Sequence, residues 1–226
     1  MHILTFTKKR LGWLAIALLG MLGMLLWLSP AENTLGNTVK LVYLHGALVR
    51  TAMALFAISL PVNLVALVSG RPGWQSWGWA LTWAAVIIWL LHTLMSMITT
   101  YAAWGVFIAW FEPRTRFTFN LMAVSLIVLL VARLINHPRF SALVFALLAG
   151  VTLGLLPGLG LVQHPLDPIG TSSSTTIRGF YAAILLVSLG LGGLLTVWLQ
   201  ARAAATKTDS PSIQERKSYE SHYRSN

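Results

Sequence analysis

Two histidines of this chain, His45 and His164, lie at the ends of long apolar segments. A neutral imidazole in such a place can bind a metal ion. Aromatic and cationic side chains accompany them, above all in the segment "WGVFIAWFEPRTR" at residues 104–116. The candidate site residues are His45, His164, Trp104, Trp110, Arg50, Arg114, Arg116 and Arg178.

This set of side chains suits a flat, apolar, dianionic macrocycle with a metal centre, which is haem. Imidazole nitrogens of His45 and His164 could occupy both axial positions of the iron. Indole faces can lie against the porphyrin plane, and arginine forks can bind its propionates. Each class also has an ordinary role in membrane proteins, since tryptophans form interfacial belts and arginines bind lipid phosphates. The haem prediction therefore depends on all three classes meeting on one face.

The composition indicates the elements that must position these residues. The chain has 226 residues, of which 56% are hydrophobic and 10% charged, whereas a soluble domain carries about 25% charged residues. We therefore expect an all-α integral membrane protein, a bundle of transmembrane helices in a lipid bilayer. The chain has no cysteine, which excludes thiolate metal sites and disulfides. It also carries no phosphate-binding glycine motif.

Six apolar runs approach the roughly 20 residues that a membrane-spanning helix requires. The predicted spans are Leu11–Leu28, His45–Val68, Gly78–Thr99, Thr118–Ile135, Phe140–Val162 and Gly179–Ala201. The first also resembles a secretory signal, but its apolar stretch is longer than the 7–15 residues typical of one. We favour an uncleaved first helix. Residues 1–201 are then one membrane domain, and residues 202–226 are a polar cytoplasmic tail for which we expect disorder.

The distribution of lysine and arginine predicts the orientation. Eleven of the sixteen lie on the side that holds both termini, and five lie on the other side. The positive-inside rule therefore places both termini in the cytoplasm. Most of the net charge of +10 is then a topogenic signal, so we expect no nucleic-acid partner. Both site histidines fall on the outer face.

Small and polar residues inside the spans invite simpler interpretations. The glycines at 150, 154 and 158 share one helical face, which favours close helix packing. The cluster Gly190, Gly192 and Gly193 is interpreted in the same way. His92 lies within the third span. It could be a second haem contact or part of a proton relay, but we favour a hydrogen bond to a neighbouring helix, for example through Thr93 or Ser96.

The chain resembles a known family, the haem-handling WWD-domain proteins of cytochrome c assembly, and within it the six-span CcmC type. "LVYLHGALV" is similar to the tyrosine-leucine-histidine motif at the start of the second span. Residues 104–116 resemble a thinned version of the tryptophan-rich outer segment that ends in Trp-Asp-Pro-Arg. Here Glu112 stands where the family has aspartate. His164 lies in the last outer loop, where the family has its second histidine.

The resemblance implies a function and its partners. His45 and His164 would be the axial ligands of a non-covalent b-type haem, with Trp104 and Trp110 in the platform beneath it. The protein would sit in a bacterial cytoplasmic (inner) membrane as a multi-pass protein. It would hold haem on the outer face and pass it to a haem chaperone or apocytochrome c, together with an ATP-binding cassette haem-handling complex.

Other function classes fit less of the sequence. A non-haem membrane scaffold subunit, a divergent paralogue within an assembly or electron-transfer complex, is the alternative that the thinned tryptophan segment favours. A transporter would need a polar pathway, and the spans carry few polar residues. The chain has only six carboxylates, and no acid pair or nucleophile–base spacing is present. We therefore do not expect an enzyme.

Overall fold

The structure of this protein is a computed structural model that describes residues 2–160 and 169–208, with side chains at 9–160 and 169–203. The described residues form six long helices: α1 (His2–Leu28), α2 (Val39–Ser69), α3 (Pro72–Trp104), α4 (Pro113–Ile135), α5 (Pro138–Leu155) and α6 (Thr175–Thr208). A short 3-10 helix, η1 (Leu156–Gly158), extends α5. All six helices are long and apolar enough to cross a membrane. The predicted all-α class with six spans is therefore confirmed.

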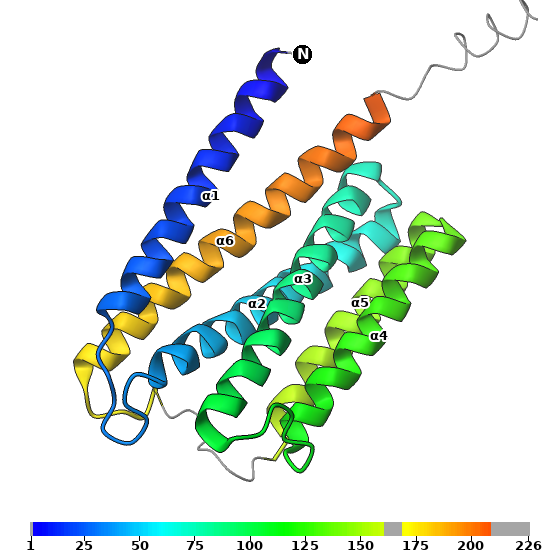
Figure 1. The fold of residues 1–226 in the computed structure, drawn as a ribbon. Helices are drawn as coiled ribbons and strands as arrows, with labels where there is room; N and C mark the ends of the chain where they lie inside the picture. The colour runs from blue at the N-terminus through cyan, green and yellow to red at the C-terminus, as the bar shows by residue number, and fades with distance from the viewer. Residues whose placement is uncertain (1, 161–168, 209–226) are drawn as a thin grey trace, which may run out of the picture.

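The helices α2 and α3 form an antiparallel hairpin at the centre of the bundle (Figure 1). The pair α4 and α5 packs on one side of this hairpin, and α6 packs on the other with α1 along it. We call the end with the α2–α3 and α4–α5 turns the turn end. The opposite end, where residues 29–38 and 105–112 connect the helices, is the loop end (Figure 1).

Prolines and left-handed residues determine where several helices begin and end. Proline stands in the first turn of α3, α4 and α5, where its missing N–H costs nothing. Gly70, Gly105 and Asn136 end α2, α3 and α4 with φ angles of 63°, 74° and 48°. Most of these caps lie outside the apolar runs, so α2, α3 and α4 are longer than their predicted spans. The predicted span Phe140–Val162 is too long at its end, because α5 ends at Leu155 and η1 at Gly158.

Five of the six helices extend beyond their predicted spans, and α3 does so by six residues at its start and five at its end. The helix α2 begins at Val39, six residues before the predicted start, so His45 lies in its second turn and not at its first residue. The helix α6 continues to Thr208, beyond the predicted end at Ala201. The rest of the predicted polar tail, residues 209–226, lies outside the described residues, as does the predicted end of the fifth span at Val162.

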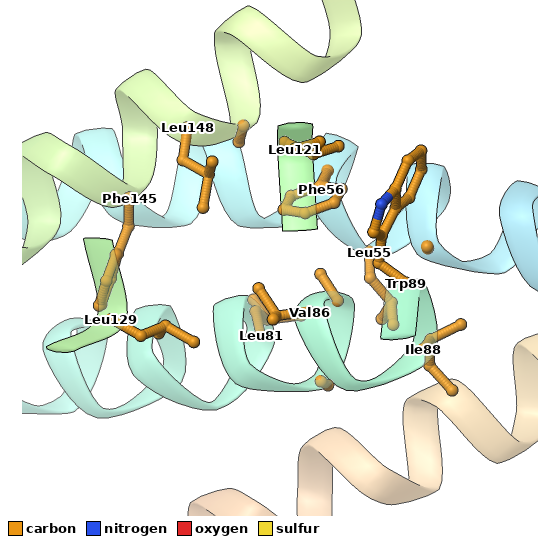
Figure 2. Packing of buried hydrophobic residues seen from close by; sticks show 14 of the residues in the cluster. Leu55, Phe56, Leu81, Val86, Ile88, Trp89, Leu121, Leu129, Phe145 and Leu148 are labelled. Carbon is orange, nitrogen blue, oxygen red and sulfur yellow. The ribbon is translucent and has the colours of Figure 1, made fainter. Parts of the chain in front are cut away.

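The main core fills the space between α2, α3, α4 and α5. Its largest side chain is Trp89, which is 1% exposed and packs edge-on against Phe56 at 6.4 Å between ring centroids. Figure 2 shows these two rings with leucines of α4 and α5 around them. A second, smaller cluster joins α2 to α6 near the loop end through Tyr43, Tyr181 and Ile184.

The glycines of α5 and α6 differ in what surrounds them. A Cβ at Gly192 would lie 2.8 Å from Thr51 and 3.3 Å from Leu55 of α2, which confirms close packing of α6 there. A Cβ at Gly154 or Gly158 would meet no described atom within 4 Å. The predicted close approach along one glycine face of α5 is therefore wrong at these two positions.

A turn at Glu32 precedes α2 at the loop end. Its carboxylate Oε2 accepts hydrogen bonds from the backbone N–H groups of Thr34 and Leu35, at 2.8 and 2.9 Å. The backbones of Glu32 and Gly36 also bond to each other, and Gly36 adopts φ 54°. The carboxylate thus closes the turn that leads into α2.

Acidification is expected to loosen this turn. The N–H groups of Leu35 and Thr34 hold the pKa of Glu32 below its ordinary value of 4.5. Because the folded pKa is the lower one, the stabilisation is complete above 4.5 and is lost as the pH falls through the folded pKa. NMR shifts of the Thr34 and Leu35 amides should follow this titration, and Glu32→Gln should remove it. A Glu32 carboxyl that titrates above 4.5 would contradict the prediction.

Candidate functional site

The predicted site histidine His45 lies in the loop-end half of α2, where its side chain is partly buried. Its ring stacks on that of His92 in α3, with 4.6 Å between centroids and 30° between planes. Two imidazoles from neighbouring helices therefore meet inside the bundle. We call His45 and His92 the histidine pair.

The second member of the pair is held by the core. His92 is 4% exposed, and its ring centroid lies 5.0 Å from that of Trp89. The Trp89 Nε1 donates to the backbone carbonyl of Thr118 in α4 at 3.2 Å. A continuous series of contacts thus runs from α4 through Trp89 and His92 to His45.

Thr93, one of the residues through which His92 was expected to bond, makes its hydrogen bond within its own helix. Thr93 donates its hydroxyl to the Trp89 carbonyl at 2.8 Å. The His92 ring stacks on that of His45, its neighbour on α2. Its Nδ1 atom is buried and has no hydrogen-bond partner among the described residues. The structure therefore shows a ring contact with a neighbouring helix, and the predicted hydrogen bond of His92 to such a helix stays a prediction.

The pairing of His45 with His92 was not predicted from the sequence, although a signal for it exists. In an antiparallel hairpin, residues at equal distances from the turn lie at the same level. His45 precedes Gly70 by 25 residues and His92 follows Arg71 by 21. The difference of four residues is roughly one helical turn, or about 6 Å.

One predicted arginine, Arg50, lies over a tyrosine on α6, and a second, Arg178, lies on the same helix. The guanidinium carbon of Arg50 lies 5.3 Å from the centroid of the Tyr181 ring, a cation–π distance. Arg178 is exposed and precedes Tyr181 by three residues, so it lies on the same helix face. A Cβ at Gly46 would lie 3.1 Å from the Tyr181 hydroxyl, which shows how closely α2 and α6 approach here.

His45 and Arg50 point to different neighbours. Five residues separate them on α2, which is a rotation of about 140° around the helix. The ring of His45 stacks on α3, whereas Arg50 lies over a ring of α6. The structure thus brings Arg50 to Tyr181 of α6, and brings His45 to His92 of α3.

The aromatic segment at residues 104–111 folds on itself at the loop end. Trp104 lies 6.5 Å from Phe111, and Trp110 lies 5.2 Å from Phe119 on α4, between ring centroids. Trp110 is 55% exposed. Trp104 follows His92 by twelve residues on α3, a rise of roughly 18 Å along a helix. The tryptophans and the histidine pair therefore lie at different levels of α3.

The polar residues that follow this segment form the N-cap and the first turn of α4. Glu112 is the N-cap residue and is 2% exposed. Its backbone carbonyl accepts hydrogen bonds from Thr115 and Arg116. The Nε atom of Arg114 is buried and has no hydrogen-bond partner among the described residues, whereas Arg116 is exposed. The two predicted arginines thus differ in exposure, because Arg114 is partly buried and Arg116 is exposed.

The remaining predicted ligand, His164, lies outside the described residues, so its position relative to His45 stays a prediction. Among the residues that are described, no group of three or more histidine, aspartate or glutamate side chains could hold a metal ion. The histidine pair brings together only two such side chains.

Comparison with known proteins does not assign the chain to a family. No protein-family model matches the chain, and no curated protein matches its sequence significantly.

Proposed function

We propose that this multi-pass helical membrane protein handles haem, holding it non-covalently at the loop end and passing it on. The observation that carries the proposal is the position of His45, a partly buried imidazole in the loop-end half of a membrane helix, stacked on a second imidazole. Ionisable groups inside membrane helices are costly, and they mark functional sites more often than chance allows.

The donor set of this end fits haem. When bound, haem supplies an iron whose axial positions accept imidazole nitrogens. The lone pair of an imidazole nitrogen lies in the plane of its ring. The rings of His45 and His92 are stacked, only 30° from parallel, so in this arrangement their lone pairs would not meet at one metal ion. We therefore assign His45 as one axial ligand, keep His164 as the other, and give His92 the role of positioning the His45 ring.

Arginines and aromatic side chains complete the proposed environment. Arg50 lies over the Tyr181 ring, Arg178 is exposed in the first turn of α6, and Arg114 and Arg116 are in the first turn of α4. Guanidinium groups bind carboxylates such as propionates in a bidentate manner. The exposed ring of Trp110, which packs on Phe119, and the ring of Trp104, which packs on Phe111, offer apolar surface for the macrocycle edge.

The proposal includes an orientation and partners. Both termini lie in the cytoplasm of a bacterium, and the loop end faces outward across the inner membrane. The positions of lysine and arginine support this, because more of them lie at the turn end than at the loop end among the described residues. Haem would pass to a haem chaperone or apocytochrome c, with an ATP-binding cassette haem-handling complex as the further partner.

A haem titration of the purified protein tests the proposal. We expect a Soret band that saturates with haem, and His45→Ala should weaken the affinity at least about tenfold because it removes a metal ligand. His137→Asn is the matched control. His137 caps α5 at the turn end by accepting from Phe140 N–H at 3.2 Å, and asparagine keeps that acceptor.

A specific observation favours one second candidate, a membrane scaffold subunit without haem. The loop segment exposes Val106, Phe107, Trp110 and Phe111 by 41% to 56%, and exposed apolar groups of this kind dock partner proteins. If no Soret band forms, or if His45→Ala and His137→Asn leave the same spectrum as the unaltered protein, the haem proposal is wrong. Stable co-purification of a partner without haem would then support the scaffold.

A further inference from the structure

An apolar groove lies at the turn end of the bundle, away from the histidine pair. Its volume is about 580 Å³, and it is open on one side to the surroundings of the helices. Side chains of α2 and α3 form its walls, and a single charged residue lies among them. The lining residues are Ile58, Val62, Arg71, Gly73, Trp74, Trp77 and Leu81.

The α2–α3 turn fixes the charged end of this groove. Gly70 ends α2 in a left-handed conformation, and Arg71 caps α3 in an extended one. The side chain of Gln75 reaches back and donates to the Gly70 carbonyl at 3.1 Å. The backbone at Arg71 is therefore held in place by the turn, with the N-terminus of α3 directly beside it.

A second arginine comes to the same turn from α5. A Cβ at Gly70 would lie 3.5 Å from Nη2 and 3.7 Å from Nε of Arg139. The guanidinium of Arg139 thus lies over the residue next to Arg71. The α2–α3 turn thus has Arg139 over Gly70, Arg71 at the next position and the N-terminus of the 33-residue helix α3 after it, and each of these favours an anion.

The protein supplies no anion of its own there within its described part. The chain has six carboxylates. Glu32 and Glu112 are at the loop end, and the others lie outside the described residues. The described part of this area thus carries positive charge without a carboxylate beside it, which favours binding of an anion. The groove next to it offers apolar side chains for an apolar chain.

We propose that this groove binds an anionic phospholipid of the leaflet at the turn end. The phosphate lies between Arg71 and Arg139, and one acyl chain occupies the groove against Ile58, Val62 and Leu81. Trp74 and Trp77 are 41% and 38% exposed, as indoles are at the headgroup level. Basic pockets between membrane helices bind anionic headgroups in this way. The site does not depend on the proposed haem function.

Native mass spectrometry of the full-length protein released from detergent tests this proposal. The probes are dioleoyl phosphatidylglycerol and dioleoyl phosphatidylcholine, which share acyl chains and differ in headgroup charge. We expect phosphatidylglycerol to bind more tightly, and Arg71→Gln or Arg139→Gln to weaken its binding about fivefold each. Arg133→Gln is the matched control, because Arg133 is exposed at the same end in the last turn of α4 and does not line the groove.

A second pair of variants tests the acyl chain. Val62→Trp should fill the groove and weaken phosphatidylglycerol binding with both arginines intact. Val65→Trp, on a part of α2 that is 41% exposed and does not line the groove, should leave it unchanged. Equal binding of the two lipids, an equal loss in Arg133→Gln, or no effect of Val62→Trp would overturn the proposal. Inorganic phosphate is the last test. If phosphate alone stabilised the protein against heat as much as phosphatidylglycerol does, the ligand would be a free anion and the proposal would be wrong.

Discussion

Gly78→Ala is expected to lower the stability of the protein by roughly 2 kcal/mol, within the range measured for overpacked cores. A Cβ at Gly78 in α3 would collide with Oδ1 of Asn63 in α2. Asn63 is 1% exposed, and its Nδ2 donates to the backbone carbonyl and to Oγ of Ser59, both at 2.9 Å. The added methyl group therefore cannot be accommodated by a small movement of Asn63. Thermal unfolding of the purified protein in detergent measures the effect.

The hydrogen bonds around Asn63 explain why the collision is costly. The hydroxyls of Ser59 and Thr82 lie 3.0 Å apart, and Thr82 donates to the Gly78 carbonyl at 2.8 Å. All of these side chains are buried. Moving any one of them leaves a polar group without a partner in an apolar interior, which costs about 1–3 kcal/mol.

Gly193→Ala is the matched control for this prediction. Gly193 lies inside α6, and a Cβ there would meet no described atom within 4 Å. Alanine in an open helix interior is favoured over glycine by roughly 0.5–1 kcal/mol, so the control should be neutral or slightly stabilising. The two substitutions add the same methyl group and should have opposite signs. A Gly78→Ala protein as stable as the unaltered one would show that α2 and α3 do not approach as closely as described.

The spans of this fold follow from hydropathy, whereas the helix ends follow from backbone chemistry. Apolar runs suffice to predict six helices because a membrane helix must satisfy its own backbone groups. The ends lie at Gly70, Pro72, Gly105 and Pro113, outside the apolar runs. These residues carry known start and stop signals, so the longer helices could have been predicted from sequence.

The candidate site was less accessible to prediction than the fold. The type and location of His45 indicate chemistry, but its neighbour depends on which face of α2 meets α3. That choice is made by packing, which one sequence does not reveal. The α2–α3 hairpin would have allowed the level of His92 to be counted from the turn. The tryptophan segment lies far from the histidine pair because α3 continues as a helix to Trp104. The predicted span ended at Thr99, so the length of α3 was underestimated.

The second large effect is expected at Trp89, which joins the core to the candidate site. Trp89→Ala should lower stability by about 3–5 kcal/mol, the usual cost of removing a buried aromatic side chain. The indole packs against Phe56 and Phe117, with ring centroids 6.4 and 6.3 Å away. Its loss leaves a cavity between α2, α3 and α4 and removes the ring that lies 5.0 Å from His92. Thermal unfolding in detergent measures the change.

Two further variants separate the contributions of the indole. Trp89→Phe keeps most of the ring but removes the donor to the Thr118 carbonyl, so it should cost about 1–3 kcal/mol because the carbonyl is left without its partner. Leu91→Ala changes a side chain that is 46% exposed on the same helix and should stay within about 0.5 kcal/mol. The expected loss of stability therefore increases from Leu91→Ala through Trp89→Phe to Trp89→Ala, because of burial and of the lost hydrogen bond. If Trp89→Ala were no worse than Leu91→Ala, the core described between α2, α3 and α4 would be wrong, and with it the support that holds His92 against His45.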